Sequence, residues 1–389
     1  MSLISDSALS GPLEWNATLI EGDVAQEVQG LKAELDGDLI SSGAGRFARF
    51  FVENQLLDRC WLVIRKRHPG GVRIHLDTDL GGDTDDACAL VMLLGWPDVE
   101  ITGVTTVADP DGRRAAYVAH LLRLAGRADI PVVAGSQVSL TTLAKADPIV
   151  DDARHWPTDI APLPSPPGAA LDLLGRSLDG GATLVAIGPY TNLALLEVAR
   201  AGSLARQPVV VMGGWVYPPA PGLPQWGPEM DFNVQWDTRA AEIVFASARL
   251  TLVTLPVTLK THLRAADLPR LGAAGQLGQL LARQGEAHGL AHQMEKLGRE
   301  HVGLPDDLVN FQYDPVACAV AVGWSGATTE EVRLRAIREG DVLSFRPDPM
   351  GRLTRVVVEV DSAAFDKSWM SAIESASTQS VSTEDRLRP

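Results

Sequence analysis

An acidic loop between a short apolar strand and an apolar helix constrains the fold of this chain more than any other stretch. Residues 72–96 read VRIHLDTDLGGDTDDACALVMLLGW. Val72–Leu76 predicts a buried strand, and Ala87–Trp96 predicts a helix packed on a sheet. Five carboxylates lie within the ten residues that link them: Asp77, Asp79, Asp83, Asp85 and Asp86. Such crowding calls for protons or for a hard, oxygen-liganded divalent cation, Ca²⁺ or Mg²⁺.

Three other interpretations of this loop were open on sequence grounds. Taken alone, it also fits a solvated acidic turn that caps the following helix. An EF-hand would match at the first, third and sixth loop positions, but Cys88 stands where the twelfth position needs a bidentate Glu, and a strand precedes the loop. A phosphatase with a DxD motif at a strand end has weak support, because Gly81 replaces the usual Thr or Val.

Downstream of the loop, strand patterns alternate with helix patterns. Strands are expected at 100–107, 131–134, 183–187, 208–212 and 250–254, and helices at 112–125, 169–178, 192–201 and 238–247. This order predicts the α/β class, with a mainly parallel open sheet and helices on both faces. Ligands of such sheets bind outside the carboxyl ends of the strands. Residues expected at those ends are Asp77, Asp109, Ile187, Met212 and Pro256.

Composition and charge exclude several classes of partner. The net charge of -15 argues against binding to nucleic acid or to an anionic membrane. No apolar run reaches the ~18 residues of a membrane span, and the N-terminus lacks the pattern of a secretory signal, so we expect a cytoplasmic protein. The three cysteines, Cys60, Cys88 and Cys318, lie in apolar segments and are expected to be buried free thiols.

The acidic loop resembles the metal loop of the nucleoside hydrolases, the Ca²⁺-dependent N-ribohydrolases. Their pattern is DTDxGxDDAxAL, and this chain has DTDLGGDTDDACAL, two residues longer, with Asp83 in the insertion. Four further segments resemble the family in the same order, over about 240 residues: GVTTVAD at 103–109, LVAIGPYTNLA at 184–194, VMGGW with MDFNVQWD between 211 and 237, and YDPVACAV at 313–320.

The resemblance implies a Ca²⁺ site and a reaction. Its Ca²⁺ ligands would be Asp79, Asp86, Asp314 and the main-chain carbonyl of Ile187. The implied reaction is hydrolysis of the N-glycosidic bond of ribonucleosides to free base and ribose, by a Ca²⁺-bound water that Asp79 activates as general base. Asp85 would accept a ribose hydroxyl, and Asp77 would orient the metal ligands from behind. Asp83 receives no role.

The residues that the resemblance implies for substrate contacts match the family's pattern less closely than the metal loop does. Met212 would pack near the sugar, Asp231 stands where a Glu binds a ribose hydroxyl, and Asn233 keeps its place beside the 2′ and 3′ hydroxyls. The family's ribose-binding Asn falls near Asp109, with Pro110 and Asp111 as alternatives.

Recognition and departure of the base rest on other residues. Tyr313 replaces the family's His, which is thought to help the departing base, and leaves the leaving-group acid unassigned. Trp226 either stacks on the base or pins its proline-rich loop.

Two alternatives to nucleoside hydrolysis therefore remain. One is a hydrolase of a modified nucleoside or of nicotinamide riboside, and the other is a Ca²⁺- or nucleoside-binding protein without turnover. Retention of the acidic residues argues against the second. The preferred base is not fixed by the sequence, and the resemblance implies a homo-oligomer, a dimer or tetramer, that binds a small-molecule nucleoside.

The regions outside the core motifs give the expected domain organisation. Residues 1–66 resemble a truncated piece of the dihydrofolate-reductase-like reductases related to the riboflavin-biosynthesis reductase, and 67–71 form a linker. The nucleoside hydrolase domain spans 72–377, and 378–389 form a disordered tail.

The last hundred or so residues carry fewer signals. Arg264–Asp306 predicts helices, with His288 and His292 on a solvated helix or a mobile cap; Gly289 excludes a zincin motif. Thr329–Val360 suggests two strands, and Ser362–Ser375 a final helix.

Overall fold

The computed structural model describes residues 2–3, 18–19, 71–147, 152–156 and 159–384, with side chains of the last helix described as far as residue 377. The chain divides into two units, Met1–Arg67 and His68–Pro389. In the first, β1 (Ser2–Leu3) and β2 (Thr18–Leu19) pair in parallel. The rest of the expected reductase-like fragment, nearly all of the linker and Cys60 lie outside the described residues.

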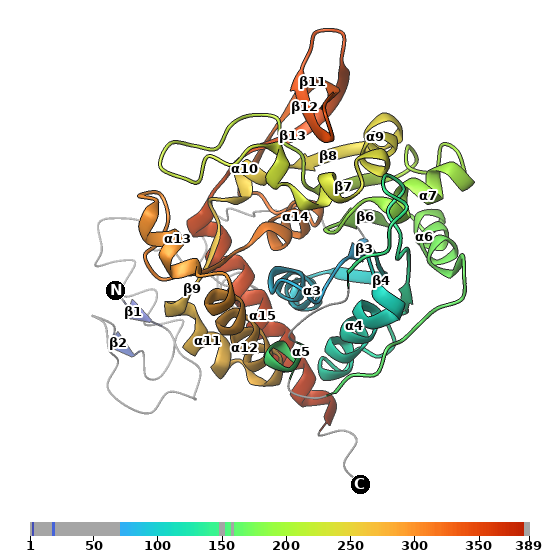
Figure 1. Ribbon diagram of the computed structural model, residues 1–389. Coiled ribbons are helices and arrows are strands. Elements are labelled where there is room, and N and C mark those ends of the chain that lie inside the picture. Colours follow the sequence, from blue (N-terminus) through green and yellow to red (C-terminus); the bar gives the residue numbers. More distant parts are fainter. Residues whose placement is uncertain (1, 4–17, 20–70, 148–151, 157–158, 385–389) are drawn as a thin grey trace, which may run out of the picture. The chain divides into compact units, whose positions relative to one another are not determined.

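A nine-stranded sheet forms the core of the second unit (Figure 1). Across the sheet the strands are β12 (Val342–Pro347), β11 (Ala327–Glu339), β13 (Arg352–Val360), β8 (Arg249–Val253), β7 (Pro208–Met212), β6 (Thr183–Ala186), β3 (Val72–Thr78), β4 (Val99–Thr106) and β5 (Val132–Ala134). Every pair from β13 to β5 is parallel, and the pairs of β11 are antiparallel. The expected α/β class with a mainly parallel sheet is confirmed.

Helices cover both faces of this sheet. One face carries α3 (Asp85–Gly95), α4 (Arg113–Leu124), α14 (Tyr313–Ala321) and α15 (Ser362–Glu384), and the other carries α6 (Ala169–Asp179), α7 (Thr191–Ala199) and α9 (Thr238–Ser247). Strand β6 shows why both faces are covered, because its side chains alternate between two apolar cores. Val185 packs in the core around α3, whereas Leu184 and Ala186 pack in the core around α7.

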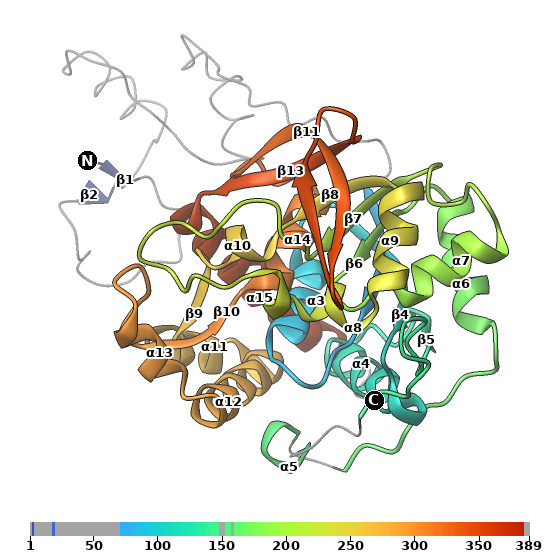
Figure 2. The ribbon, with the colours of Figure 1, turned by 45° about the horizontal axis from the view of Figure 1, so that its top comes forward.

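A smaller layer lies beside the sheet. Its strands β9 (His262–Arg264) and β10 (Leu308–Phe311) pair antiparallel, and between them the chain forms α11 (Leu268–Ala273), α12 (Gly275–Ala291) and α13 (Met294–Glu300). Figure 2 places this layer on the opposite side of the unit from α6, α7 and α9. The sequence predicted helices in this stretch, without their number, and neither strand. Strand β10 leads directly into α14, which matters for the site described below.

Helix α3 is held between the sheet and the C-terminal helix. All its residues are buried, as its apolar sequence predicts. It packs on α15 so closely that a Cβ at Gly95 would lie 1.8 Å from the carbonyl oxygen of Ala372. The close contact at Gly95 therefore fixes the C-terminal end of α3, the helix whose first turn carries Asp85 and Asp86.

The C-terminal region differs from its expected form. Three strands replace the expected two, because the short segment β12 turns back on β11 at Gly340 and Asp341, and both project beyond the rest of the sheet (Figure 1). Strand β13 then pairs in parallel with β8. Helix α15 runs to Glu384, beyond the expected end at Ser375 and past residue 378, where a disordered tail was expected.

Two further sequence expectations bear on the described residues. Cys88 and Cys318 are buried free thiols, as predicted. Among the described residues, none of the helices combines the length and the apolarity needed to cross a membrane.

Candidate active site

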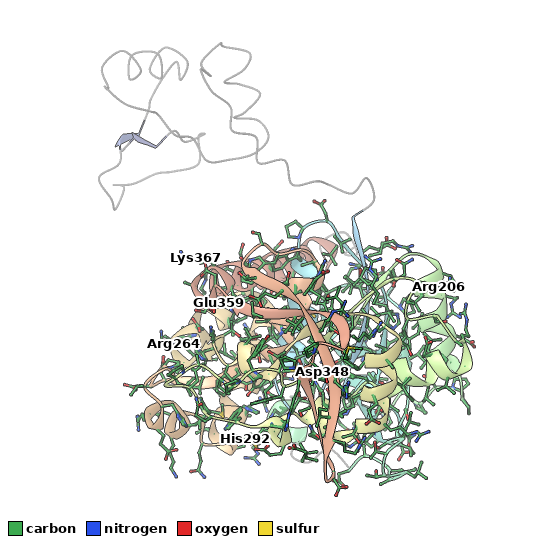
Figure 3. All side chains as sticks on the ribbon, turned by 90° about the horizontal axis from the view of Figure 1, so that it is seen from above. Arg206, Arg264, His292, Asp348, Glu359 and Lys367 are labelled. Carbon is green, nitrogen blue, oxygen red and sulfur yellow. The ribbon has the colours of Figure 1, made fainter. Side chains whose placement is uncertain are left out.

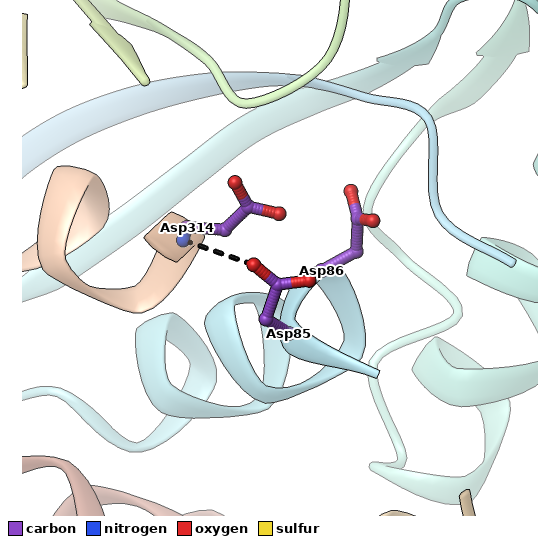
Figure 4. Close-up of side chains that lie close together, drawn as sticks. All are labelled: Asp85, Asp86 and Asp314. Carbon is purple, nitrogen blue, oxygen red and sulfur yellow. Dashed lines mark hydrogen bonds between the residues drawn. The ribbon is translucent and has the colours of Figure 1, made fainter. Parts of the chain in front are cut away.

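Acidic side chains from two helices meet near the carboxyl end of strand β3. Asp85 and Asp86 occupy the first turn of α3, and Asp314 occupies the first turn of α14. Oxygen atoms of the three carboxylates lie within 4.8 Å of one another, and the backbone N–H of Asp314 donates to Asp85 Oδ2 over 3.3 Å (Figure 4). At this spacing one cation beside Asp86 and Asp314 would also neutralise the charge of Asp85.

The electrostatics of the cluster call for such a cation. Burial raises the pKa values of Asp85, Asp86 and Asp314 well above the ordinary value, and repulsion among the carboxylates raises them further. Asp79, which follows β3, is close enough that its charge contributes to all three shifts. Without a cation, burial and repulsion favour the protonated carboxyl groups, whereas a divalent cation would favour the ionised carboxylates.

Two groups partly offset this repulsion. The Thr78 hydroxyl donates a hydrogen bond to Asp86 Oδ1, and the Arg114 guanidinium lowers the pKa values of Asp79 and Asp86. Arg114 lies on α4, and its Nε donates to the carbonyl oxygen of Ala108 over 2.8 Å. Sequence reasoning missed Arg114, because an Arg in the first turn of a helix carries no local signal of a distant acidic cluster.

Asp77 lies inside β3, behind the cluster. Its Oδ1 accepts hydrogen bonds from the Thr105 hydroxyl and, over 2.8 Å, from Asn192 Nδ2. Its Oδ2 is buried and has no hydrogen-bond partner among the described residues. Burial raises the pKa of Asp77 to about 7, and the charge of Asp79 adds to the shift. This position suits the orienting role expected of Asp77.

Three residues expected at the site meet at the ends of β6 and β7. The side-chain amide of Asn233 donates to the carbonyl oxygen of Ile187 over 2.9 Å and to that of Met212 over 3.2 Å. The Tyr190 hydroxyl also donates to the Met212 carbonyl, over 2.9 Å. The Ile187 backbone N–H in turn donates to the Asp77 carbonyl over 2.8 Å, so this group is tied to β3. Residues more than a hundred positions apart in sequence thus converge as expected.

Gly188 packs directly beside Asp79. A Cβ at this position would lie 2.7 Å from Asp79 Oδ1 and 2.9 Å from the Asp79 backbone nitrogen. We therefore expect Gly188→Ala to displace the Asp79 carboxylate and to weaken divalent-cation binding about tenfold or more, as changes beside metal ligands commonly do. Titration of the purified protein with Ca²⁺ by calorimetry measures the change.

Gly82→Ala is the matched control in the same loop. A Cβ there meets nothing within 4 Å, so its Ca²⁺ affinity should stay within about twofold of wild type, since exposed substitutions without contacts have small effects. Equal affinities for the two variants would show that Asp79 takes no part in cation binding.

Two other predicted substrate contacts have backbone partners of their own. Asp109 is buried and accepts from the Thr106 hydroxyl over 2.7 Å and from the backbone N–H groups of Arg114 and Ala115 over 2.8 and 3.0 Å. It thus caps the start of α4. Asp231 caps α8 (Phe232–Trp236), where it accepts from the backbone N–H groups of Val234 and Gly214. Burial raises the pKa of Asp231 to about 6. A ribose contact for either residue stays a prediction.

Aromatic side chains line the approach to Asp314. The ring of Phe311 lies 5.2 Å from that of Tyr313 and 5.6 Å from that of Trp226, measured between centroids. Trp226 is also tied to its own loop, because Trp215 Nε1 donates to its carbonyl oxygen over 3.1 Å. Burial raises the pKa of Tyr313 well above the ordinary tyrosine value, and the nearby carboxylates raise it further. Tyr313 therefore keeps its proton at neutral pH.

Of the two alternatives expected for His288 and His292, a solvated helix or a mobile cap, the first is wrong for His288, whereas His292 is exposed. The His288 side chain is 8% exposed, and its Nδ1 lies 3.5 Å from Asp83 Oδ1. The helical pattern of α12 taken alone predicts that His288 faces solvent. In the folded chain, Asp83 from the loop 79–84 lies against this side of the helix, and His288 is buried. Sequence alone gave Asp83 no role, and the structure places it between α12 and β10.

Comparison with known proteins adds the family context. The model of the family described as inosine-uridine preferring nucleoside hydrolase matches residues 74–367. A pyrimidine-specific ribonucleoside hydrolase, RihA, of Enterobacter sp. (strain 638) is 32% identical over 75% of this chain and 94% of its own length. RihA of Salmonella schwarzengrund is 34% identical over 66% and 84%.

Two solved structures share the fold. The plant nucleoside hydrolase PpNRh1 covers 78% of this chain and 99% of its own, with a TM-score of 0.64 and 24% identity. A purine-preferring ribonucleoside hydrolase from Gardnerella vaginalis covers the same shares, with a TM-score of 0.66 and 21% identity.

Proposed function

Because this chain belongs to the inosine-uridine preferring nucleoside hydrolase family and hydrolyses ribonucleosides to free base and ribose, we propose that it does so with Ca²⁺ in the acidic cluster and with Asp79 as general base. The observation that carries the proposal is the meeting of Asp85, Asp86 and Asp314 within 4.8 Å beside Asp79. These carboxylates come from positions as much as 229 residues apart, and burying them together is costly unless a cation neutralises their charge.

The donor set fits Ca²⁺. Every candidate ligand is an oxygen atom, from the carboxylates of Asp79, Asp86 and Asp314 and the main-chain carbonyl of Ile187, and hard divalent cations prefer such ligands. The raised pKa values of the carboxylates also fit, because a bound cation would neutralise the charges that burial penalises. A Ca²⁺ ion held there would orient the ribose 2′ and 3′ hydroxyls and lower the pKa of a water molecule.

The chain's own residues then act on the substrate. Asp79 accepts a proton from the attacking water, whose oxygen bonds to C1′ of the ribose. Asp85 and Asn233 hold ribose hydroxyls, and Asp77 fixes β3 behind them. Holding the sugar and the water in one orientation removes much of the entropic cost of their meeting.

The preferred substrates are pyrimidine ribonucleosides. This choice is supported by the relatives at 31–34% identity, which are named pyrimidine-specific ribonucleoside hydrolases. Modified nucleosides and nicotinamide riboside stay as alternative substrates, because Tyr313 stands where the family has His. The homo-oligomeric state, a dimer or tetramer, and the cytoplasmic location also stay predictions.

Release of base and ribose from a panel of nucleosides tests the function. We expect uridine and cytidine to be cleaved faster than inosine, adenosine and guanosine, with release followed by chromatography. Removal of divalent cations with a chelator should lower the rate at least about a hundredfold, and added Ca²⁺ should restore it, because a metal supplies several kcal/mol of stabilisation. Cleavage that is insensitive to chelation would refute the metal's role. Absence of cleavage of all five nucleosides by the Ca²⁺-loaded protein would refute the substrate class.

A further inference from the structure

An imidazole and a carboxylate meet at the rim of the proposed site, and the roles assigned so far use neither. His288 on α12 points its Nδ1 at Asp83 Oδ1, 3.5 Å away. Nδ1 is buried and has no hydrogen-bond partner among the described residues, so the Asp83 carboxylate at 3.5 Å is the charged group that faces it. A buried ring nitrogen left with one carboxylate as its neighbour is uncommon unless the pair has a function.

Asp83 is fixed in place by its other contacts. The side-chain amide of Asn310 on β10 and the backbone N–H of Thr84 both donate to Asp83 Oδ1, the oxygen that faces His288. The acidic loop, α12 and β10 are thereby joined at a single oxygen atom. This arrangement gives a physical purpose to Asp83, which the sequence left unexplained.

The pair lies next to the ring that replaces the family's histidine. The charge of Asp83 raises the pKa of Tyr313, which places the Asp83 carboxylate near that phenol. Tyr313 follows Phe311 and Asn310 along the chain, so the pair, the aromatic rings and Asp314 border the same region. Because burial makes the Tyr313 phenol a weaker acid than an ordinary tyrosine, it is poorly suited to give a proton to a leaving group.

We propose that His288 is the proton donor to the departing base and that Asp83 is the residue that positions it. The inference rests on the proposed function and adds a residue to it. Asp83 accepts the hydrogen bond of Nδ1–H, which fixes the ring and leaves Nε2–H to face the base, as a carboxylate does for a catalytic imidazole in other hydrolases.

The step balances without another reactant. The C1′–N bond breaks and its electron pair goes to the base, which takes the Nε2 proton of His288. The water oxygen bonds to C1′, and a water proton goes to Asp79. Exchange with solvent then returns a proton from Asp79 to His288, so the net change is water added across the glycosidic bond.

The groups around His288 set how readily it holds that proton. Burial is the largest influence and lowers the pKa of His288. The imidazoles of His292, just after α12, and of His155 on α5 (Asp152–His155) lower it too, and Asp83 raises it. Asp83 is thus the group that opposes the loss of the proton, which agrees with a positioning role.

A change of leaving group tests the proposal. Uracil needs a proton as it leaves, whereas 4-nitrophenolate does not, so 4-nitrophenyl β-D-ribofuranoside separates acid catalysis from the rest of the reaction. We expect His288→Ala and His288→Gln to lower kcat for uridine about 10²-fold to 10⁴-fold, and kcat for the nitrophenyl riboside less than about threefold. Asp83→Asn should lower kcat in the same direction by a smaller factor.

His292→Ala is the matched control. His292 directly follows α12; its imidazole stacks on that of His288, with centroids 4.3 Å apart, but the residue is exposed at the surface (Figure 3). We expect it to leave both rates within about threefold of wild type. The rise in Tm that Ca²⁺ causes should be the same in every variant, which shows that fold and cation site are intact.

Several results would overturn the proposal. Equal losses for both substrates in His288→Gln would assign His288 a purely structural role, and no loss for either would leave it without a role in the reaction. Wild-type protein that cleaves the nitrophenyl riboside but no nucleoside would have no working acid, although its hydrolytic centre would stand. Wild-type protein that cleaves neither, with Ca²⁺ bound, would refute the proposed function itself.

Discussion

Asp79→Asn is expected to lower kcat/KM for uridine at least about 10³-fold while the protein remains folded. The substitution removes both the proposed general base, worth about 10² to 10⁴ in rate, and a ligand of the cation. It keeps the size of the side chain, so the contact with Gly188 stays sterically possible. Steady-state release of uracil in saturating Ca²⁺ measures the loss, and circular dichroism checks the fold.

The control for this variant is Asp172→Asn, which removes a carboxylate from the exposed surface of α6. Its kcat/KM should match wild type. Turnover of Asp79→Asn within tenfold of wild type would require a different base. Unchanged uridine affinity with no turnover by wild type or variant would favour the binding protein that the sequence left open.

The second large effect is a change in how pH acts on stability. Without divalent cations we expect the free energy of unfolding to fall as pH rises from about 4 to 8. Burial raises the pKa of Asp77 to about 7 and those of Asp85, Asp86 and Asp314 well above the ordinary aspartate value. In this range these carboxyl groups therefore hold more protons in the folded chain than in the unfolded chain, and each extra proton costs about 1.4 kcal/mol per pH unit as pH rises. Buried His75 and His262, whose pKa values are lowered to about 3 and about 4, act in the opposite sense below about pH 6.5, so the fall should be steepest above that pH.

Ca²⁺ should reverse most of this loss, because it binds the ionised carboxylates of the folded chain. At a hundred times Kd it adds about 2.7 kcal/mol. The increase in Tm on adding Ca²⁺ should therefore grow from pH 5 to pH 8, as calorimetric scans at matched ionic strength can measure. Asp314→Asn should lessen the pH dependence of the cation-free protein and lose most of the Ca²⁺ effect. A cation-free Tm that rises with pH over this range would contradict the buried, mutually repelling cluster.

Sequence alone located the central strand, the acidic loop and α3, because their signals are local. Crowded carboxylates after an apolar strand indicate a cation site whatever surrounds them. The alternation of strand and helix then places Ile187 and Met212 at neighbouring strand ends, since carboxyl ends of parallel strands share one edge of a sheet. The observed β6 and β7 end within a residue of the expected positions.

Long-range contacts account for what could not be predicted. His288 is buried against a loop about two hundred residues earlier in the chain. The spacing of apolar residues along α12 does not reveal that contact. Asp109, which was expected near the ribose because GVTTVAD resembles the family's segment, also accepts from two backbone N–H groups at the start of α4, a contact that the sequence did not predict. Strand β12 was missed because a six-residue segment after a tight turn resembles the loop that was expected there.

The positions of α3, α14 and α15 along the chain also determine when the acidic cluster can form during translation. Asp85 and Asp86 emerge early, but Asp314 follows 229 residues after Asp85, and α15, which covers the outer side of α3, is translated last. A nascent chain therefore cannot assemble the acidic cluster until α14 has been translated. A chain cut before α14 would lack Asp314 and would be inactive, so catalytic competence itself reports that translation has passed α14.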